Sequence, residues 1–147
     1  MKSILPELLI LLSSFSLLIV GVFLKTFNKI INYIIILLLA ALIFFVYFNF
    51  TGSTNLFDNS YTIDPLSNFM KIIVLISVLF TMLISNSYLE KLKLTKFEYP
   101  IILLLSTLGM FVMISANNLI VFYLGLELQS LCLYVLAAIN KIGRAHV

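Results

Sequence analysis

Charged residues are scarce in this sequence. Of its 147 residues, 10% are charged and 63% are hydrophobic, and the mean hydropathy is +1.19. A soluble domain keeps about a quarter of its residues charged, because its surface faces water. The composition therefore excludes an ordinary soluble domain and predicts an all-α, polytopic membrane protein. Helices are expected because a chain in lipid must satisfy its own backbone hydrogen bonds.

Cysteine and histidine are nearly absent. The single thiol, Cys132, closes no internal disulfide and has no second cysteine beside it to hold a metal, so we interpret it as a small packing residue. Phosphate loops, nucleotide fingerprints and catalytic Ser/His/Asp sets are also missing. We therefore expect no cofactor in this chain. The net charge of +3 comes from lysines in short connections, which indicate membrane topology and not a nucleic-acid partner.

Five apolar runs are long enough to cross a bilayer, which takes about 20 residues. The first is too long for a signal peptide and has no small-residue cleavage pattern after it, so it is expected to be retained. The predicted spans are Ile4–Leu24, Ile30–Phe48, Pro65–Asn86, Tyr99–Ala116 and Leu119–Ile139.

Lysines concentrate in alternate connections, within residues 25–29 and 91–96 and at Lys141. The positive-inside rule assigns these connections to the cytoplasm. The N-terminus, the segment Asn49–Ile63 and the turn at residues 117–118 are then outside. One alternating scheme fits every connection, which favours five spans.

The turn at residues 117–118 is too short to join distant helices. The fourth and fifth spans should therefore form an antiparallel hairpin, and small side chains in them would let the two backbones approach closely. These small residues are Ser106, Gly109, Ser115, Ala116 and Gly125.

One acidic residue differs from the others in its depth. Glu127 lies about 12 Å into the fifth span at ~1.5 Å per residue. A charge at such depth costs about 2.5–3.5 kcal/mol on insertion scales. We predict that Glu127 is a proton carrier; the alternative is that it only joins helices by hydrogen bonds. The other five acidic residues are interpreted as helix caps or solvated surface groups, and they are Glu7, Asp58, Asp64, Glu90 and Glu98.

Hydroxyl groups follow Glu127 along its helix. Tyr123, Ser130 and Tyr134 are spaced to share its face and could order water leading to the carboxylate. Lys71, inside the third span, is a second candidate for support of proton movement. The alternative is that the long side chain of Lys71 only extends its ammonium group to the outer membrane interface.

From residue 97 onward several segments, among them the run Gly-Leu-Glu-Leu-Gln-Ser at residues 125–130, resemble subunit N of the proton-pumping NADH–quinone oxidoreductases, the respiratory complex I family. The run Gly-Leu-Glu-Leu-Gln-Ser around Glu127 is the most specific of them, while Asn118 stands where relatives often have aspartate. The segments that carry the resemblance are Phe97–Pro100, Leu105–Met110, Met113–Asn117, Tyr123–Leu131 and Leu133–Ala138.

The resemblance implies a fold of about fourteen helices with two inverted five-helix repeats. Residues 1–96 would supply three N-terminal helices, and residues 97–141 the hairpin that opens the first repeat. Glu127 would be the family's fifth-helix glutamate, which pairs with a lysine on a later helix. The implied activity is proton translocation driven by electron transfer from NADH to quinone.

Partners and location follow from the same resemblance. It implies other membrane subunits of complex I and the lipid bilayer as partners. NADH, FMN, iron–sulfur clusters and quinone would be bound by partner subunits, and a bacterial inner membrane is favoured over a mitochondrial one. The alternatives left open are a stand-alone cation/proton antiporter and a non-transporting membrane scaffold.

The final segment, residues 142–147, matches the translation of a common sequencing adapter. We therefore expect Asn140 or Lys141 to be the last authentic residue and the protein to continue in further spans. Arg144 and His146 are given no function on this interpretation.

Overall fold

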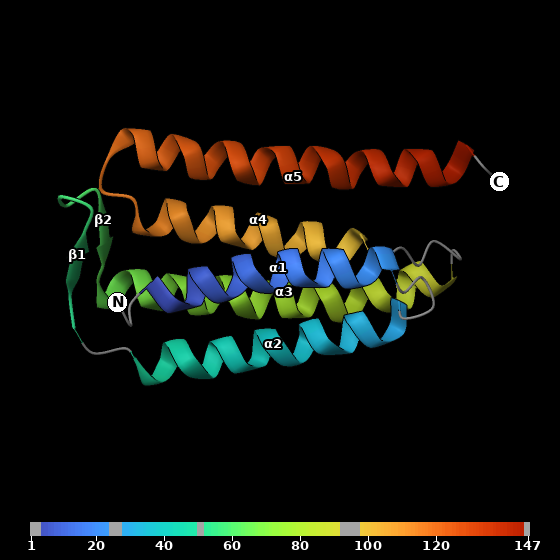
Figure 1. Cartoon of the computed structure of the whole chain (residues 1–147), viewed down its shortest axis with the longest axis horizontal. Helices are drawn as coiled ribbons and strands as arrows, with labels where there is room; N and C mark the ends of the chain where they lie inside the picture. Colours follow the sequence, from blue (N-terminus) through green and yellow to red (C-terminus); the bar gives the residue numbers. More distant parts are fainter. Residues whose placement is uncertain (1–3, 24–27, 50–51, 92–97, 146–147) are drawn as a thin grey trace.

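A computed structural model describes residues 4–23, 28–49, 52–91 and 98–145, and it consists of a helical bundle with one β-hairpin (Figure 1). Within these described residues, five helices are long and apolar enough to cross a membrane, which confirms the predicted fold class. The elements are α1 (Leu5–Phe23), α2 (Asn28–Phe48), β1 (Thr54–Leu56), β2 (Tyr61–Ile63), α3 (Pro65–Lys91), α4 (Glu98–Ser115) and α5 (Leu119–Ala145).

The helices lie roughly along one direction and alternate in sense (Figure 1). The first turn of α1, the β-hairpin, the start of α3 and the α4–α5 turn all lie at one end of the bundle, which we call the hairpin end. This agrees with the alternation predicted from the lysines, of which Lys25, Lys93 and Lys96 lie outside the described residues. Which end faces the cytoplasm stays a prediction.

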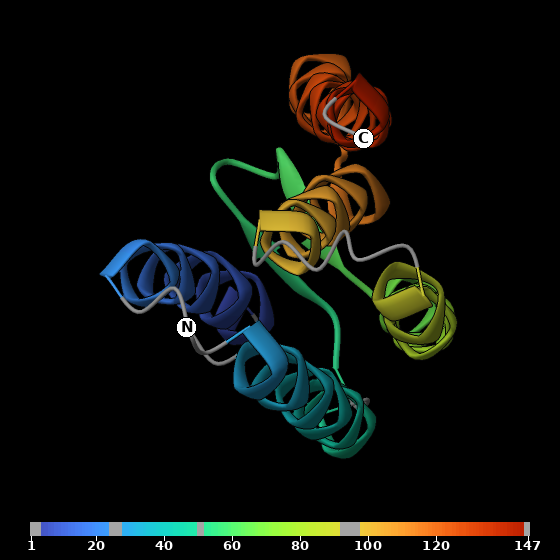
Figure 2. The same cartoon turned by 90° about the vertical axis from the view of Figure 1, so that its right-hand side faces the viewer.

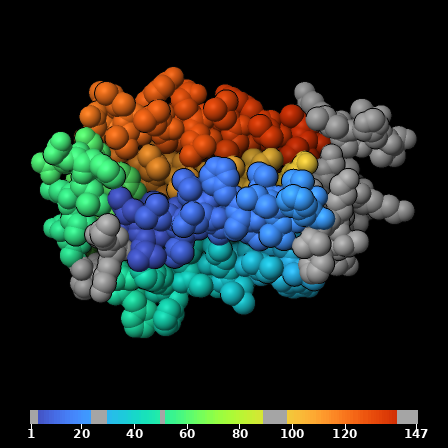
Figure 3. All heavy atoms as spheres, in the orientation of Figure 1, coloured from blue at the N-terminus to red at the C-terminus, as the bar shows by residue number. Residues whose placement is uncertain are grey.

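An apolar core joins the first four helices, and α5 lies at its edge (Figure 2). In the spanning stretch of α4, 56% of the residues are buried, against 11% in α5. Figure 3 shows α5 as an outer ridge along one side of the molecule. The helix also continues to Ala145, through most of the segment expected to be an artefact. Most of the surface of α5 is therefore left uncovered by the described part of this chain.

Two glycines set the close packing of α4 against α5. A Cβ atom added to Gly109 would lie 2.8 Å from the backbone nitrogen of Gln129, and one added to Gly125 would lie 2.9 Å from the carbonyl oxygen of Gly109. Real side chains do not approach backbone atoms this closely, so both positions require glycine. The predicted hairpin with small residues at its interface is confirmed.

The β-hairpin was not expected from the sequence, which indicated only an outer connection. Its strands pair antiparallel, with Leu56 opposite Tyr61. The turn uses three successive residues with positive φ, namely Phe57 at 52°, Asp58 at 51° and Asn59 at 64°. Aspartate and asparagine tolerate this region better than most residues, but phenylalanine does not, so other contacts must hold the turn.

Those contacts come from the α4–α5 turn. Tyr61 forms an isolated β-bridge with Ala116, and the backbone N–H of Asn117 donates to the carbonyl of Ser60 at 3.0 Å. The side-chain amide of Asn117 also donates to the carbonyl of Asn59 at 2.8 Å. The hairpin is therefore fixed directly to the turn that begins α5.

Candidate functional site

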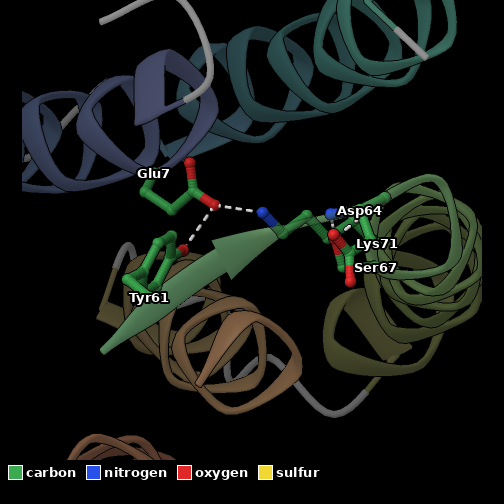
Figure 4. Close-up of polar contacts among 5 residues, drawn as sticks. All are labelled: Glu7, Tyr61, Asp64, Ser67 and Lys71. Carbon is green, nitrogen blue, oxygen red and sulfur yellow. Dashed lines mark hydrogen bonds and ion pairs between the residues drawn. The ribbon is translucent and has the colours of Figure 1, made fainter. Parts of the chain in front are cut away.

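A buried cluster of polar side chains lies at the hairpin end, formed by Glu7, Tyr61 and Lys71 (Figure 4). The Lys71 ammonium donates to Oε1 of Glu7 at 2.5 Å, and the Tyr61 hydroxyl donates to the same oxygen at 2.8 Å. Lys71 is 1% exposed and Glu7 is 7% exposed. Three elements, α1, β2 and α3, thus each supply one group to a site closed off from solvent.

The start of α3 sets the position of Lys71. Asp64 and Pro65 begin the helix as the sequence predicted, since proline suits the first helical position. The Ser67 hydroxyl accepts a hydrogen bond from the backbone N–H of Asp64 at 2.7 Å and lies 2.8 Å from the Asp64 carbonyl, to which it donates. This local bonding fixes the first turn of α3, and Lys71 follows it on the buried face.

The strand period positions Tyr61. Successive side chains of a strand point to opposite faces, and in β2 Tyr61 and Ile63 are buried while Thr62 is only partly covered. Tyr61 therefore points into the bundle and not toward solvent. Its neighbour across the bridge, Ala116, holds the strand in this register.

Two aromatic rings surround the charge of Lys71. The ammonium nitrogen lies 5.7 Å from the centre of the Tyr61 ring and 5.6 Å from that of Phe111 on α4. Cations within about 6 Å of a ring are attracted by its negative face. The carboxylate and the two rings together offset the loss of water around the ammonium group.

The second carboxylate oxygen of Glu7 differs from the first. Oε2 is buried and has no hydrogen-bond partner among the described residues, whereas Oε1 accepts two hydrogen bonds. Burial, followed by the negative charge of Glu7, raises the pKa of the Tyr61 phenol. Tyr61 therefore stays protonated at neutral pH and remains a donor to Oε1.

This cluster corrects two interpretations made from the sequence. Glu7 is not a solvated helix cap, because the β-hairpin and α3 cover it. Lys71 does not extend to an interface, because its ammonium group turns inward to Glu7. The sequence did contain one signal: an acid and a base lie near the hairpin ends of two spans, Glu7 in the first turn of α1 and Lys71 in the second turn of α3. Tyr61 had no such signal, since its position depends on the unpredicted hairpin.

Glu127 has a different environment. It lies on α5 and is only half-buried. In the described part of the chain, its carboxylate forms no ion pair. Tyr123 is 59% exposed and Tyr134 is 70% exposed, so both face outward. The Ser130 hydroxyl donates to the carbonyl of Leu126, at 2.5 Å, and not to the Glu127 carboxylate. The predicted polar stripe is therefore present on α5 but is open to whatever lies beside this helix.

In the described residues, no three His, Cys, Asp or Glu side chains lie close enough together to hold a metal ion. Cys132 is a buried free thiol on α5.

Comparisons with known proteins agree with the predicted resemblance. The chain is 44% identical over 140 residues to NADH-quinone oxidoreductase subunit N of Pelagibacter ubique, a match that covers 94% of this chain and 30% of the relative. The same subunit of Bartonella bacilliformis is also 44% identical over 140 residues, covering 94% of this chain and 28% of the relative. No family model matches the chain.

A solved structure has the same fold. Respiratory complex I from Thermus thermophilus with bound aureothin contains a chain that matches with a TM-score of 0.77 at 22% identity, covering 90% of this chain and 28% of that one. The chain thus spans about three tenths of the length of the proteins it matches. Its resemblance to subunit N is confirmed over nearly all of its length.

Proposed function

Because this chain is similar to subunit N along 94% of its length, we propose that it forms part of a membrane-arm subunit of an NADH–quinone oxidoreductase. The single observation that carries this proposal is the set of relatives bearing that name, at 40–44% identity over 140 residues. In this role the chain couples electron transfer from NADH to quinone with proton translocation. It does so without binding a redox cofactor itself.

Glu127 is the residue we propose as the proton carrier. Its carboxylate lies within a spanning helix, where an unpaired charge costs about 2.5–3.5 kcal/mol. The described chain leaves that carboxylate half-buried and without an ion-pair partner. The exposed face of α5 is suited to receive further helices of the protein, which would supply a cationic partner and exclude lipid. Tyr123, Ser130 and Tyr134 would then line the same enclosed face.

The location we propose is a bacterial inner membrane with the hairpin end outside. The relatives are bacterial, and five helices of the described chain can span a bilayer. NADH, FMN, iron–sulfur clusters and quinone belong to partner subunits in this scheme. The neighbours of the chain are then other membrane subunits of complex I and lipid.

Isolation of the full reading frame from its native membrane tests this proposal. A tagged full-length protein should copurify with NADH–quinone reductase activity. It should also copurify with subunits whose spectra show flavin and iron–sulfur clusters. The untagged strain, taken through the same purification, is the control. A protein that purifies alone and exchanges cations for protons in liposomes would instead support a stand-alone antiporter. Purification alone with no exchange would support a scaffold.

A further inference from the structure

We propose that Glu7, Lys71 and Tyr61 form a second proton-exchange site, in which Oε2 of Glu7 takes up and releases a proton at the hairpin end of the bundle. This site is separate from Glu127 and goes beyond the function proposed for it. The inference depends on the geometry of the cluster and not on the relatives of the chain.

The unequal use of the two carboxylate oxygens is the first argument. Lys71 and Tyr61 both donate to Oε1, while Oε2 is buried without a partner among the described residues. An ion pair that served only to hold helices together would be most stable with donors on both oxygens, since an unsatisfied buried acceptor is costly. Oε2 is therefore the oxygen on which a proton can bind without displacing a donor of the described residues.

Both charge states of the site have partners, which is the second argument. With Oε2 unprotonated, the Glu7 carboxylate and the Lys71 ammonium form a neutral pair. When one proton adds to Oε2, an O–H bond forms, Glu7 becomes neutral and the cluster carries one positive charge. The Lys71 ammonium then loses its counter-charge but keeps its hydrogen bond to Oε1 and its contacts with the Tyr61 and Phe111 rings, which offset part of that loss. Release of the proton reverses this step, and no other bond changes.

The surroundings contain few competing groups. The titratable residues that face Glu7 in the described structure are Lys71 from α3 and Tyr61 from β2. Helix α4 contributes the Phe111 ring and, beside Tyr61, the Ser115 hydroxyl, neither of which changes charge near neutral pH. Asp58 and Asp64 are exposed at the same end. A protonation change inside the cluster is thus assigned to Glu7.

The site is closed off from solvent but lies at one end of the bundle. Glu7 lies in the first turn of α1, and the short hairpin that covers it is bonded to the α4–α5 turn through Ala116 and Asn117. The hydrogen bond from Tyr61 to Glu7 joins this hairpin to α1. Uptake of a proton by Glu7 therefore changes a contact of the hairpin, and the hairpin is in turn bonded to the turn that begins α5.

Infrared difference spectroscopy of the complete complex in membranes, across a pH titration, tests the proposal. The wild type should show a carboxylic-acid carbonyl band that appears reversibly on acidification, and Glu7→Gln should abolish it. Glu98→Gln is the matched control, since Glu98 is an exposed carboxylate in the first turn of α4, and it should leave the band unchanged. Absence of such a band in the wild type, or its persistence in Glu7→Gln, would overturn the proposal.

A second variant keeps the test decisive if Glu7→Gln does not assemble. Tyr61→Phe retains both charges but removes one donor to Oε1, so it should shift the frequency of the acid band. An unchanged frequency would count against the site. Glu127→Gln should leave the Glu7 band in place, so failure of the role proposed for Glu127 and failure of this inference give different results.

Discussion

Glu7 and Glu127 are both carboxylates in membrane-spanning helices, but the described chain surrounds them differently. Glu7 is 7% exposed and paired with Lys71 and Tyr61, while Glu127 is half-buried and has no ion pair within the described residues. Depth along the sequence therefore identified the acid that the described chain leaves without an ion pair. It did not identify the acid that this chain buries by itself. Burial of a charged side chain therefore depends on which helices and strands pack around it, and not only on its distance from a helix end.

Removal of the counter-charge of Glu7 should have the largest effect on stability. Lys71→Met leaves a buried carboxylate with no cation, and breaking a buried pair in this way costs about 3–5 kcal/mol. Thermal unfolding of the full-length protein in detergent should show the loss. The double variant Glu7→Gln/Lys71→Met removes both charges and should recover most of it. If the double variant is as unstable as Lys71→Met, Lys71 does not stabilise the protein through the ion pair.

The close glycine contact between α4 and α5, the helix of Glu127, should give the next largest effect. A Cβ at Gly125 would lie 2.8 Å from a side-chain carbon of Met113 and 2.9 Å from the carbonyl oxygen of Gly109. Gly125→Ala should therefore push α5 away from α4, at about 1–3 kcal/mol, the usual cost of overpacking. The control is Leu124→Ala on the exposed side of the same helix. Equal stability of the two variants would contradict the close approach.

Loss of a single hydrogen bond at the Glu7 site should have a smaller effect. Tyr61→Phe keeps the ring over Lys71 but removes the 2.8 Å bond to Glu7, and such bonds to charged groups contribute about 1.5–3 kcal/mol. Since Lys71 still donates to Oε1, we expect the lower part of this range. Tyr33→Phe, on an exposed tyrosine of α2, is the matched control and should be neutral in the same unfolding assay. A neutral Tyr61→Phe would place the Tyr61 hydroxyl outside the site.

Neutralising Glu127 should change stability least. Glu127→Gln keeps the shape of the side chain, and the described chain makes no ion pair with it. In the 147-residue chain alone, without the further helices, the free energy of unfolding should therefore change by about 0.5 kcal/mol or less, as for most surface substitutions. The measurement is thermal unfolding of this 147-residue chain in detergent. A loss as large as that of Lys71→Met would mean that Glu127 is a structural residue like Glu7.

The helices of this fold could be predicted from the sequence, because their limits depend on local features. Apolar runs of spanning length gave all five helices, and Asp64 with Pro65 gave the start of α3. The tight α4–α5 pair was also predictable, since a two-residue turn and glycines at Gly109 and Gly125 leave few other arrangements.

The Glu7 site could not be predicted, because it depends on contacts between distant parts of the chain. The strands of the hairpin are only three residues each, too short to give a clear alternating pattern. Their register is fixed by Ala116 and Asn117, more than 50 residues further along the chain. Without that hairpin, nothing in the sequence places Tyr61 beside Glu7 or shows that Lys71 turns inward.

Proton translocation coupled to NADH oxidation, measured in inverted membrane vesicles, tests the central claim about Glu127 most directly. With Glu127→Gln in the full-length protein, the complex should assemble at wild-type levels, while proton uptake and coupled turnover should fall. The Glu98→Gln variant, with an exposed carboxylate removed, should behave as the wild type. Wild-type proton uptake by an assembled Glu127→Gln complex would contradict the account.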